Sequence, residues 1–230
     1  ALVKGMKNKP TYNFYPFNHK TEEFDVIIYK NRCVLFPKEN APDWRSACGY
    51  VVFKKTDVPK DWWGDYNAPG LQQLMIHGGL TYCQQAEVPN QKKITEKFNK
   101  KIKQLYEKEK SGDHKQAMSM LDKKSKLIKD LNSELAKSDE GYVVFGFDCG
   151  HYKDKENANL KDPNHVMILT EQMESQLLKF KESYEEYKNA HEAVKGIVRK
   201  TIMTNIHREA DIQCEMGFGA MLDLLANGEE

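Results

Sequence analysis

The chain has 230 residues, which is enough for one domain with an appendage. Lys and Arg total 35 and Asp and Glu total 34, so the net charge is +1. A net charge this small favours neither nucleic acid nor an anionic membrane as a partner. The five widely spaced cysteines form no CxxC motif, which favours a reducing, cytoplasmic compartment over a disulfide framework.

No apolar run has the length of a membrane span, and the N-terminus lacks the apolar core of a signal peptide. The first third of the chain has strand patterns instead. Residues 24–30 and 33–36 are rich in β-branched and aromatic side chains, and Asn31 and Arg32 between them predict a hairpin. Residues 49–55 have the same composition and predict a third strand.

The sequence IHGGLTYC (76–83) has the clearest turn signal. Gly78 and Gly79 separate two short apolar runs and supply the positive φ angles that a type I′ turn requires. The spacing predicts a β-hairpin over residues 71–83 in which His77 and Leu80 flank the turn. His77 would then lie at an accessible hairpin tip.

The middle of the chain changes to helical periodicity. Apolar residues recur every three or four positions over 94–110, and a second stripe follows the SGD break at 111–113, where Asp113 can cap a helix. The pattern predicts a helical hairpin of coiled-coil type over 94–138, inserted into a core domain formed by 1–93 and 139–230. Glu and Asp are mixed among its lysines, which favours a solvated face over a nucleic-acid patch.

Strand periodicity returns in YVVFGFD (142–148). Val143, Phe145 and Phe147 would face the core, while Gly146 on the opposite face would leave space beside Asp148. Residues 165–170 fit a strand or a helix entry, a long helix follows from Thr170, and 208–225 is also helical in pattern. We therefore predict an α+β fold with a mainly antiparallel sheet, an inserted helical hairpin and C-terminal helices.

Residues 148–154, DCGHYKD, concentrate reactive side chains at the end of this strand. Asp148 beside His151 could form an oriented general base, and His77, Asp148, His151 and Asp154 would also suit a divalent metal ion. Cys149 beside His151 allows a nucleophile, although adjacent side chains at a strand end point apart. The structural alternatives are that Asp148 caps the following turn and that His77 only completes a hairpin.

Aromatic residues are a second candidate feature. Trp62, Trp63 and Tyr66 could form a wall for a base or a sugar, or could pack over the sheet. The ligand-binding set predicted from the sequence is therefore Gly78, Gly79, Thr81, Trp62 and Trp63.

Three blocks, CGYVVF (48–53), IHGGLTYC (76–83) and FGFDCGHYKD (145–154), resemble an uncharacterised family of small phage and prophage proteins. That family has a GYV strand, an HGGLTY block and a GFDxxH block that closes on an Asp. The resemblance implies that the family positions here are His77, Gly78, Gly79, Thr81, Asp148, His151 and Asp154. The hairpin at 94–138 and the long C-terminal region depart from the shorter members.

Two functional hypotheses follow. The first is a small-ligand site, with a nucleotide-like ligand and either binding or hydrolysis, in which His77, Asp148 and His151 are catalytic and a divalent metal is one candidate cofactor. The second is a non-enzymatic phage protein, either a virion component or an inhibitor of a host factor, that acts through its helical surfaces or forms a homo-oligomer through them. Both fit a cytoplasmic location, in the host if the chain is phage-encoded, with the virion as the alternative.

Overall fold

The computed structural model describes residues 12–68, 70–109, 114–151, 154–190 and 192–194. The chain divides into two compact units, 1–184 and 185–230. In the second unit, residues 185–190 and 192–194 are helical, and the predicted helix at 208–225 lies outside the described residues. The fold below is that of the first unit.

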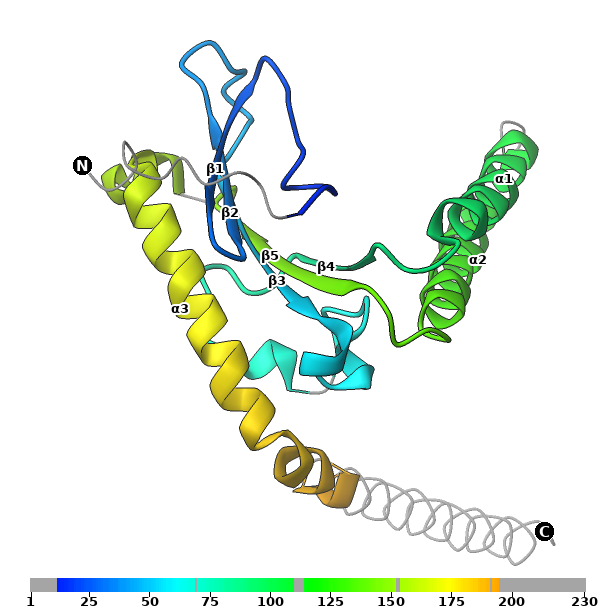
Figure 1. The fold of residues 1–230 in the computed structure, drawn as a ribbon. Coiled ribbons are helices and arrows are strands. Elements are labelled where there is room, and N and C mark those ends of the chain that lie inside the picture. Colours follow the sequence, from blue (N-terminus) through cyan, green and yellow to red (C-terminus); the bar gives the residue numbers. More distant parts are fainter. Residues whose placement is uncertain (1–11, 69, 110–113, 152–153, 191, 195–230) are drawn as a thin grey trace, which may run out of the picture. The chain divides into compact units, whose positions relative to one another are not determined.

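The described part of the first unit contains one five-stranded sheet with the strand order β1-β2-β3-β5-β4 (Figure 1). Every neighbouring pair is antiparallel. The strands are β1 (Phe24–Tyr29), β2 (Arg32–Pro37), β3 (Cys48–Lys54), β4 (Tyr82–Ala86) and β5 (Tyr142–Asp148). With the helices α1 (Gln91–Glu109), α2 (His114–Leu135) and α3 (Pro163–Glu182), the sheet confirms the α+β prediction.

The first hairpin is confirmed, with its turn one residue earlier than predicted. Tyr29 pairs with Arg32, so Lys30 and Asn31 form the turn, and Lys30 has a positive φ of 56°. Arg32 and Asn31 then contact Glu174 of α3 through ion-pair and hydrogen-bond contacts. These contacts attach the β1–β2 hairpin to the helix that covers the sheet.

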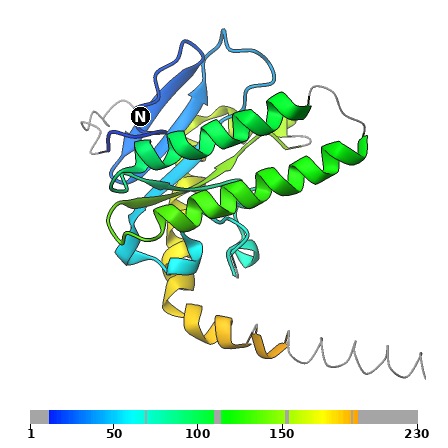
Figure 2. The same cartoon turned by 90° about the vertical axis from the view of Figure 1, so that its right-hand side faces the viewer.

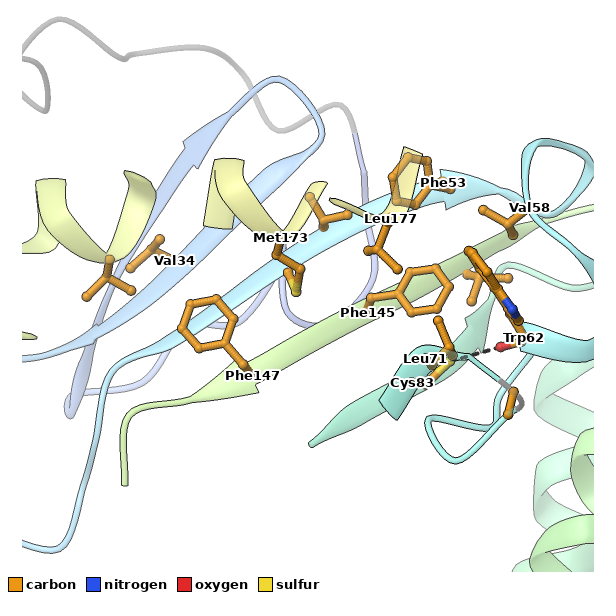
Figure 3. Close-up of a cluster of buried hydrophobic side chains, with 14 of the residues drawn as sticks. Val34, Phe53, Val58, Trp62, Leu71, Cys83, Phe145, Phe147, Met173 and Leu177 are labelled. Carbon is orange, nitrogen blue, oxygen red and sulfur yellow. Dashed lines mark hydrogen bonds between the residues drawn. The ribbon is translucent and has the colours of Figure 1, made fainter. Parts of the chain in front are cut away.

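Side chains alternate between two buried faces of the sheet, as the period of a strand requires. On one face, Phe145 and Phe147 belong to a core cluster with Met173 and Leu177 of α3, and the Trp62 ring lies edge-on to Phe145 (Figure 3). On the other face, the side chains of Tyr50, Val52 and Val144 pack against an aromatic N-terminal segment that contains Tyr12, Phe14 and Phe17. The predicted core face of β5 is confirmed.

The space predicted beside Asp148 is filled. A side chain at Gly146 would collide with the ring of Tyr50, which lies against the glycine from the neighbouring strand β3. Gly146 therefore allows the close approach of an aromatic ring and leaves no room there for a ligand.

The segment at 165–170 is helical because α3 begins before it. Pro163 occupies the first turn, and the side chain of Asp162 accepts a hydrogen bond from the backbone N–H of Asn164 at 2.9 Å. Both features favour a helix start. α3 ends at Glu182, and residues 184–190 are again helical.

The helical hairpin consists of α1 and α2, which run side by side (Figure 2). Buried Lys55, which follows β3, joins the hairpin to the sheet. Its Nζ donates to the carbonyl oxygens of Leu135, the last residue of α2, and of Ser138, which follows α2, at 2.9 and 2.5 Å. Gln85 of β4 donates to the Asn132 carbonyl at 2.9 Å. The hairpin and the sheet thus belong to one compact unit.

Candidate functional site

The segment around His77 is a turn and does not form the predicted hairpin. The backbone N–H of Gly79 donates to the carbonyl of Ile76 at 2.9 Å, so His77 and Gly78 are the central residues of the turn. Gly78 has a φ of 64°, which suits the third position of a type II turn. β4 begins only at Tyr82.

A long-range contact explains why no strand precedes this turn. The backbone N–H and C=O of Met75 both bond to the side-chain amide of Gln176 in α3, each at 2.8 Å. Residues 71–73 form a 3-10 turn. Because the Gln176 amide satisfies the backbone that a strand partner would otherwise bond, the first arm of the hairpin does not form.

The His77 turn is attached to the end of β5. The N–H of Thr81 donates to the carbonyl of Gly146 at 3.0 Å, extending the β4–β5 pairing by one bond. The imidazole of His77 lies edge-on to the ring of Phe147, with the centroids 6.1 Å apart. His77 is therefore on the Phe147 side of the sheet.

The loop after β5 places a second histidine and a carboxylate beside His77. Asp154, at the start of a 3-10 turn, accepts a hydrogen bond through Oδ2 from the backbone N–H of His151 at 2.9 Å. The same oxygen lies 3.2 Å from His151 Nδ1 and 3.0 Å from His77 Nε2. We call His77, His151 and Asp154 the His–Asp cluster.

The His–Asp cluster is compact enough that it could hold a metal ion. One nitrogen of each imidazole and one carboxylate oxygen all lie within 4.8 Å of one another. The side chains of His77, His151 and Asp154 are 22%, 39% and 12% exposed, so the cluster is open to solvent on the His151 side. Burial raises the pKa of Asp154, but hydrogen bonds from His77 and His151 outweigh burial and hold that pKa below its usual value. The carboxylate is therefore charged at neutral pH.

The two glycines in the predicted ligand-binding set differ in their surroundings. A side chain at Gly78 would collide with the imidazole of His151, whereas one at Gly79 would meet no atom within 4 Å. Both have positive φ angles, 64° and 82°. Gly78 thus allows His151 to approach the turn, while Gly79 serves the backbone conformation alone. Thr81 is held through its backbone, and its side chain is exposed.

Asp148 lies outside the cluster. In strand alternation it follows Phe147 and points to the other side of the sheet, where its Oδ1 accepts a hydrogen bond from the N–H of Gly150 at 2.9 Å. This is the turn-capping alternative, and the partner of the two histidines is Asp154. Cys149 is buried, and burial raises the pKa of its thiol to about 12, so it carries no thiolate at neutral pH.

The two tryptophans predicted as a ligand wall belong to the core. Trp62 and Trp63 are 0% and 7% exposed, and the Trp62 ring stacks on Phe180 at 6.0 Å. Trp63 donates its Nε1–H to the Lys55 carbonyl at 3.1 Å. Neither indole ring is available to a ligand, because both side chains are buried.

A different group of aromatic residues lines a cavity. This partly open pocket, of about 260 Å³, lies near the start of β3, and its lining includes Tyr15, Phe24, Trp44 and Arg45. The Arg45 guanidinium stacks on Trp44 at 3.8 Å and pairs with Glu23 at 2.6 Å. None of these residues is among those predicted from the sequence, although the aromatic run YNFYPF (12–17), which contains Tyr15, is a signal that could have indicated the pocket.

Comparisons with protein-family models, with curated proteins and with solved structures return no match to this chain.

Proposed function

We propose that this chain is a phage-type accessory protein that binds a divalent metal ion at the His–Asp cluster and uses that site to bind or hydrolyse a small ligand. The observation that carries the proposal is the convergence of the His77, His151 and Asp154 ligand atoms within 4.8 Å. The phage assignment rests on the HGGLTY and GFDxxHxxD blocks in the sequence.

The donor types favour a transition-metal ion or zinc. Two imidazoles and one carboxylate match the ligands of catalytic zinc sites and of the 2-His-1-carboxylate sites of non-haem iron. Three protein ligands leave coordination positions open, and such an ion supplies an activated water or polarises a bound oxygen. Asp154 is ionised at neutral pH, as a metal ligand must be.

Without a metal ion, the same three residues could act in general acid–base catalysis. The Asp154 carboxylate could orient either imidazole by accepting its N–H, as the acidic member of a catalytic triad does. However, one oxygen serves both histidines, and the two imidazoles converge on it from separate segments. This convergence favours an ion between them over a single oriented base.

Metal binding is tested by titrating Zn²⁺ and Mn²⁺ into chelator-treated protein, with calorimetry as the readout. We expect one ion per chain, and at least a tenfold loss of affinity for His77→Ala and Asp154→Asn because each removes one of three ligands. Asp148→Asn is the matched control, because asparagine keeps the oxygen that accepts from Gly150. Equal affinity in all four proteins would overturn the metal assignment.

Hydrolysis is tested separately on the loaded protein, with bis(p-nitrophenyl) phosphate and nucleoside triphosphates as probes. Turnover that Asp154→Asn abolishes and Asp148→Asn retains would assign an enzyme. Metal binding with saturable nucleotide binding and no turnover would assign a sequestering protein. Ligand binding that both variants retain would place the ligand elsewhere, with the cavity beside Arg45 as the next site to test.

The second candidate function is a non-enzymatic phage protein that acts through its helices. The observation in its favour is that α1 and α2 form an arm with many exposed lysines. Replacing 101–127 by a short Gly-Ser linker would shorten the arm while keeping Leu135 and Ser138, which bind Lys55. If the shortened protein keeps full biological activity and Asp154→Asn loses it, this second function is excluded.

A further inference from the structure

Positive charge is concentrated on the helical hairpin. Residues 91–105 of α1 and the 122–137 segment that contains the end of α2 carry eleven lysines and four acidic residues, a net charge of +7. The whole chain has a net charge of +1, so the remainder is acidic. The small net charge of the whole chain is therefore the sum of a strongly basic helical hairpin and an acidic remainder. It does not exclude a negatively charged partner at the hairpin.

Helices α1 and α2 of this arm lie side by side (Figure 2), and residues of both line a groove. Its volume is about 360 Å³, and half-buried Leu105 and Leu127 contribute apolar surface to its lining. Lys101, Lys123 and Lys126 also line it. We call this feature the lysine groove.

The groove lysines carry charge that is free to meet a partner. Among the residues whose side chains the structure describes, which excludes 106–121, no carboxylate lies within ion-pair distance of Lys101, Lys123 or Lys126. All three side chains are exposed, and Lys101 Nζ lies 5.1 Å from the ring of Phe98, so its apolar stem covers the helix. The one acidic residue in the lining, Asp130, leaves a net positive rim.

We propose that the lysine groove binds an acidic amphipathic helix of a partner protein. Apolar side chains of that helix would pack on Leu105 and Leu127, and carboxylates along its flanks would face Lys101, Lys123 and Lys126. Helix-in-groove recognition combines an apolar stripe with a charged rim in this way. The proposal does not depend on the metal site.

The composition of the arm favours a protein helix over nucleic acid. Helices α1 and α2 contain no Arg or Trp, and their two aromatic residues are Phe98, which is buried, and Tyr106. Proteins that bind single strands stack successive bases on several exposed aromatic or Arg side chains, and a single tyrosine does not form such a series. A duplex backbone would meet the lysines but has no apolar ridge to cover Leu105 and Leu127.

The test is fluorescence anisotropy of the full chain with a labelled synthetic probe helix. The probe has Leu at i, i+3, i+4 and i+7 and Glu at the flanking positions, and a second probe has every Glu replaced by Gln. We expect K101E/K123E/K126E to weaken binding of the Glu probe by at least tenfold. The matched control, K92E/K93E/K100E, makes the same charge change on the arm outside the groove lining and should weaken it by less than threefold.

The outcomes distinguish specific binding of a helix in the lysine groove from non-specific attraction of any polyanion by the arm. Equal losses in the two triple variants, or tighter binding of a 20-base-pair duplex than of the Glu probe, would overturn the proposal in favour of non-specific attraction of polyanions. Equal binding of the Gln probe would also overturn it, because the rim charges would then contribute nothing. Circular dichroism of both variants checks that the helices are retained.

Discussion

The imidazole of His151 occupies the space into which any side chain at Gly78 would project. This contact joins the IHGG turn to the loop after β5 and sets the distance between the two histidines, whose ring centroids are 5.7 Å apart. Gly78→Ala should therefore displace His151 and reduce metal affinity by tenfold or more. The measurement is Zn²⁺ calorimetry on chelator-treated protein.

Gly79→Ala is the control for that variant. Gly79 has a similar positive φ of 82° but no neighbour within 4 Å of an added side chain. Alanine at either position strains the backbone by about 1–2 kcal/mol. Equal stability losses with a loss of metal affinity only in Gly78→Ala would assign the effect to the His151 contact. Equal affinity losses would mean that the contact does not position the metal ligands.

Much of the sheet could be predicted from the sequence because local patterns determine it. The alternation in β5 placed Val143, Phe145 and Phe147 on the core face, where they lie. The first hairpin followed from two β-branched runs with a short break. The IHGG segment differed because its partner is distant: the amide of Gln176, 101 residues away, bonds the backbone of Met75. No local signal identifies that contact.

The residues of the candidate site could be predicted only in part, because the site also depends on contacts between distant segments. The sequence selected His77, His151 and Asp154, but also Asp148. Strand alternation shows that Asp148 and Phe147 point to opposite sides, yet it does not show on which side the His77 turn lies. The structure places His77 against Phe147 and so pairs it with Asp154. Tertiary structure, and not local sequence, therefore determines that Asp154 rather than Asp148 lies beside the two histidines.

The lowered pKa of Asp154 predicts how the stability of the metal-free protein depends on pH. A carboxylate whose pKa is lower in the folded chain stabilises the fold above its unfolded pKa, about 3.9. That stabilisation is lost as the pH falls through the folded pKa. Urea unfolding of wild type and Asp154→Asn from pH 7 to 3 should show a difference of about 1–2 kcal/mol at pH 7 that shrinks below about pH 4. A constant difference across this range would contradict the assigned hydrogen bonds.

Lys55 provides a stability test of how the hairpin is attached. Its buried ammonium donates to Leu135 and Ser138 and lies 4.3 Å from the ring of Trp63. Burial lowers its pKa, and the nearby carboxylate of Asp139 offsets that effect only in part. Lys55→Met should lower the free energy of unfolding by about 2 kcal/mol, because two carbonyls at the end of α2 lose their donor.

Lys60→Met is the matched control for Lys55. Lys60 is 63% exposed and pairs with Asp139 at 3.5 Å, so its loss should change stability by no more than about 0.5 kcal/mol.

The contacts of Lys55 with Leu135 and Ser138 also determine how much of the helical hairpin can be removed without destabilising the sheet. Deleting all of 94–138 would remove both carbonyl partners of Lys55 and should destabilise the sheet, whereas replacing 101–127 should not.

The buried thiol of Cys149 predicts a loss of stability at alkaline pH. Burial raises its pKa in the folded chain to about 12, while an unfolded cysteine ionises near about 8.5. Between these values the unfolded chain loses a proton that the folded chain keeps, so stability falls as the pH rises, by up to about 1.4 kcal/mol per pH unit.

Urea unfolding from pH 8 to 10.5 should show a shallower decline in stability for Cys149→Ala and Cys149→Ser than for wild type. Val144→Ala, which removes buried volume without an ionisable group, should shift stability by a constant amount across the same range. If Cys149→Ala kept the wild-type slope, the thiol would have to ionise as readily in the folded chain as in the unfolded one, and Cys149 would again be a candidate nucleophile beside His151.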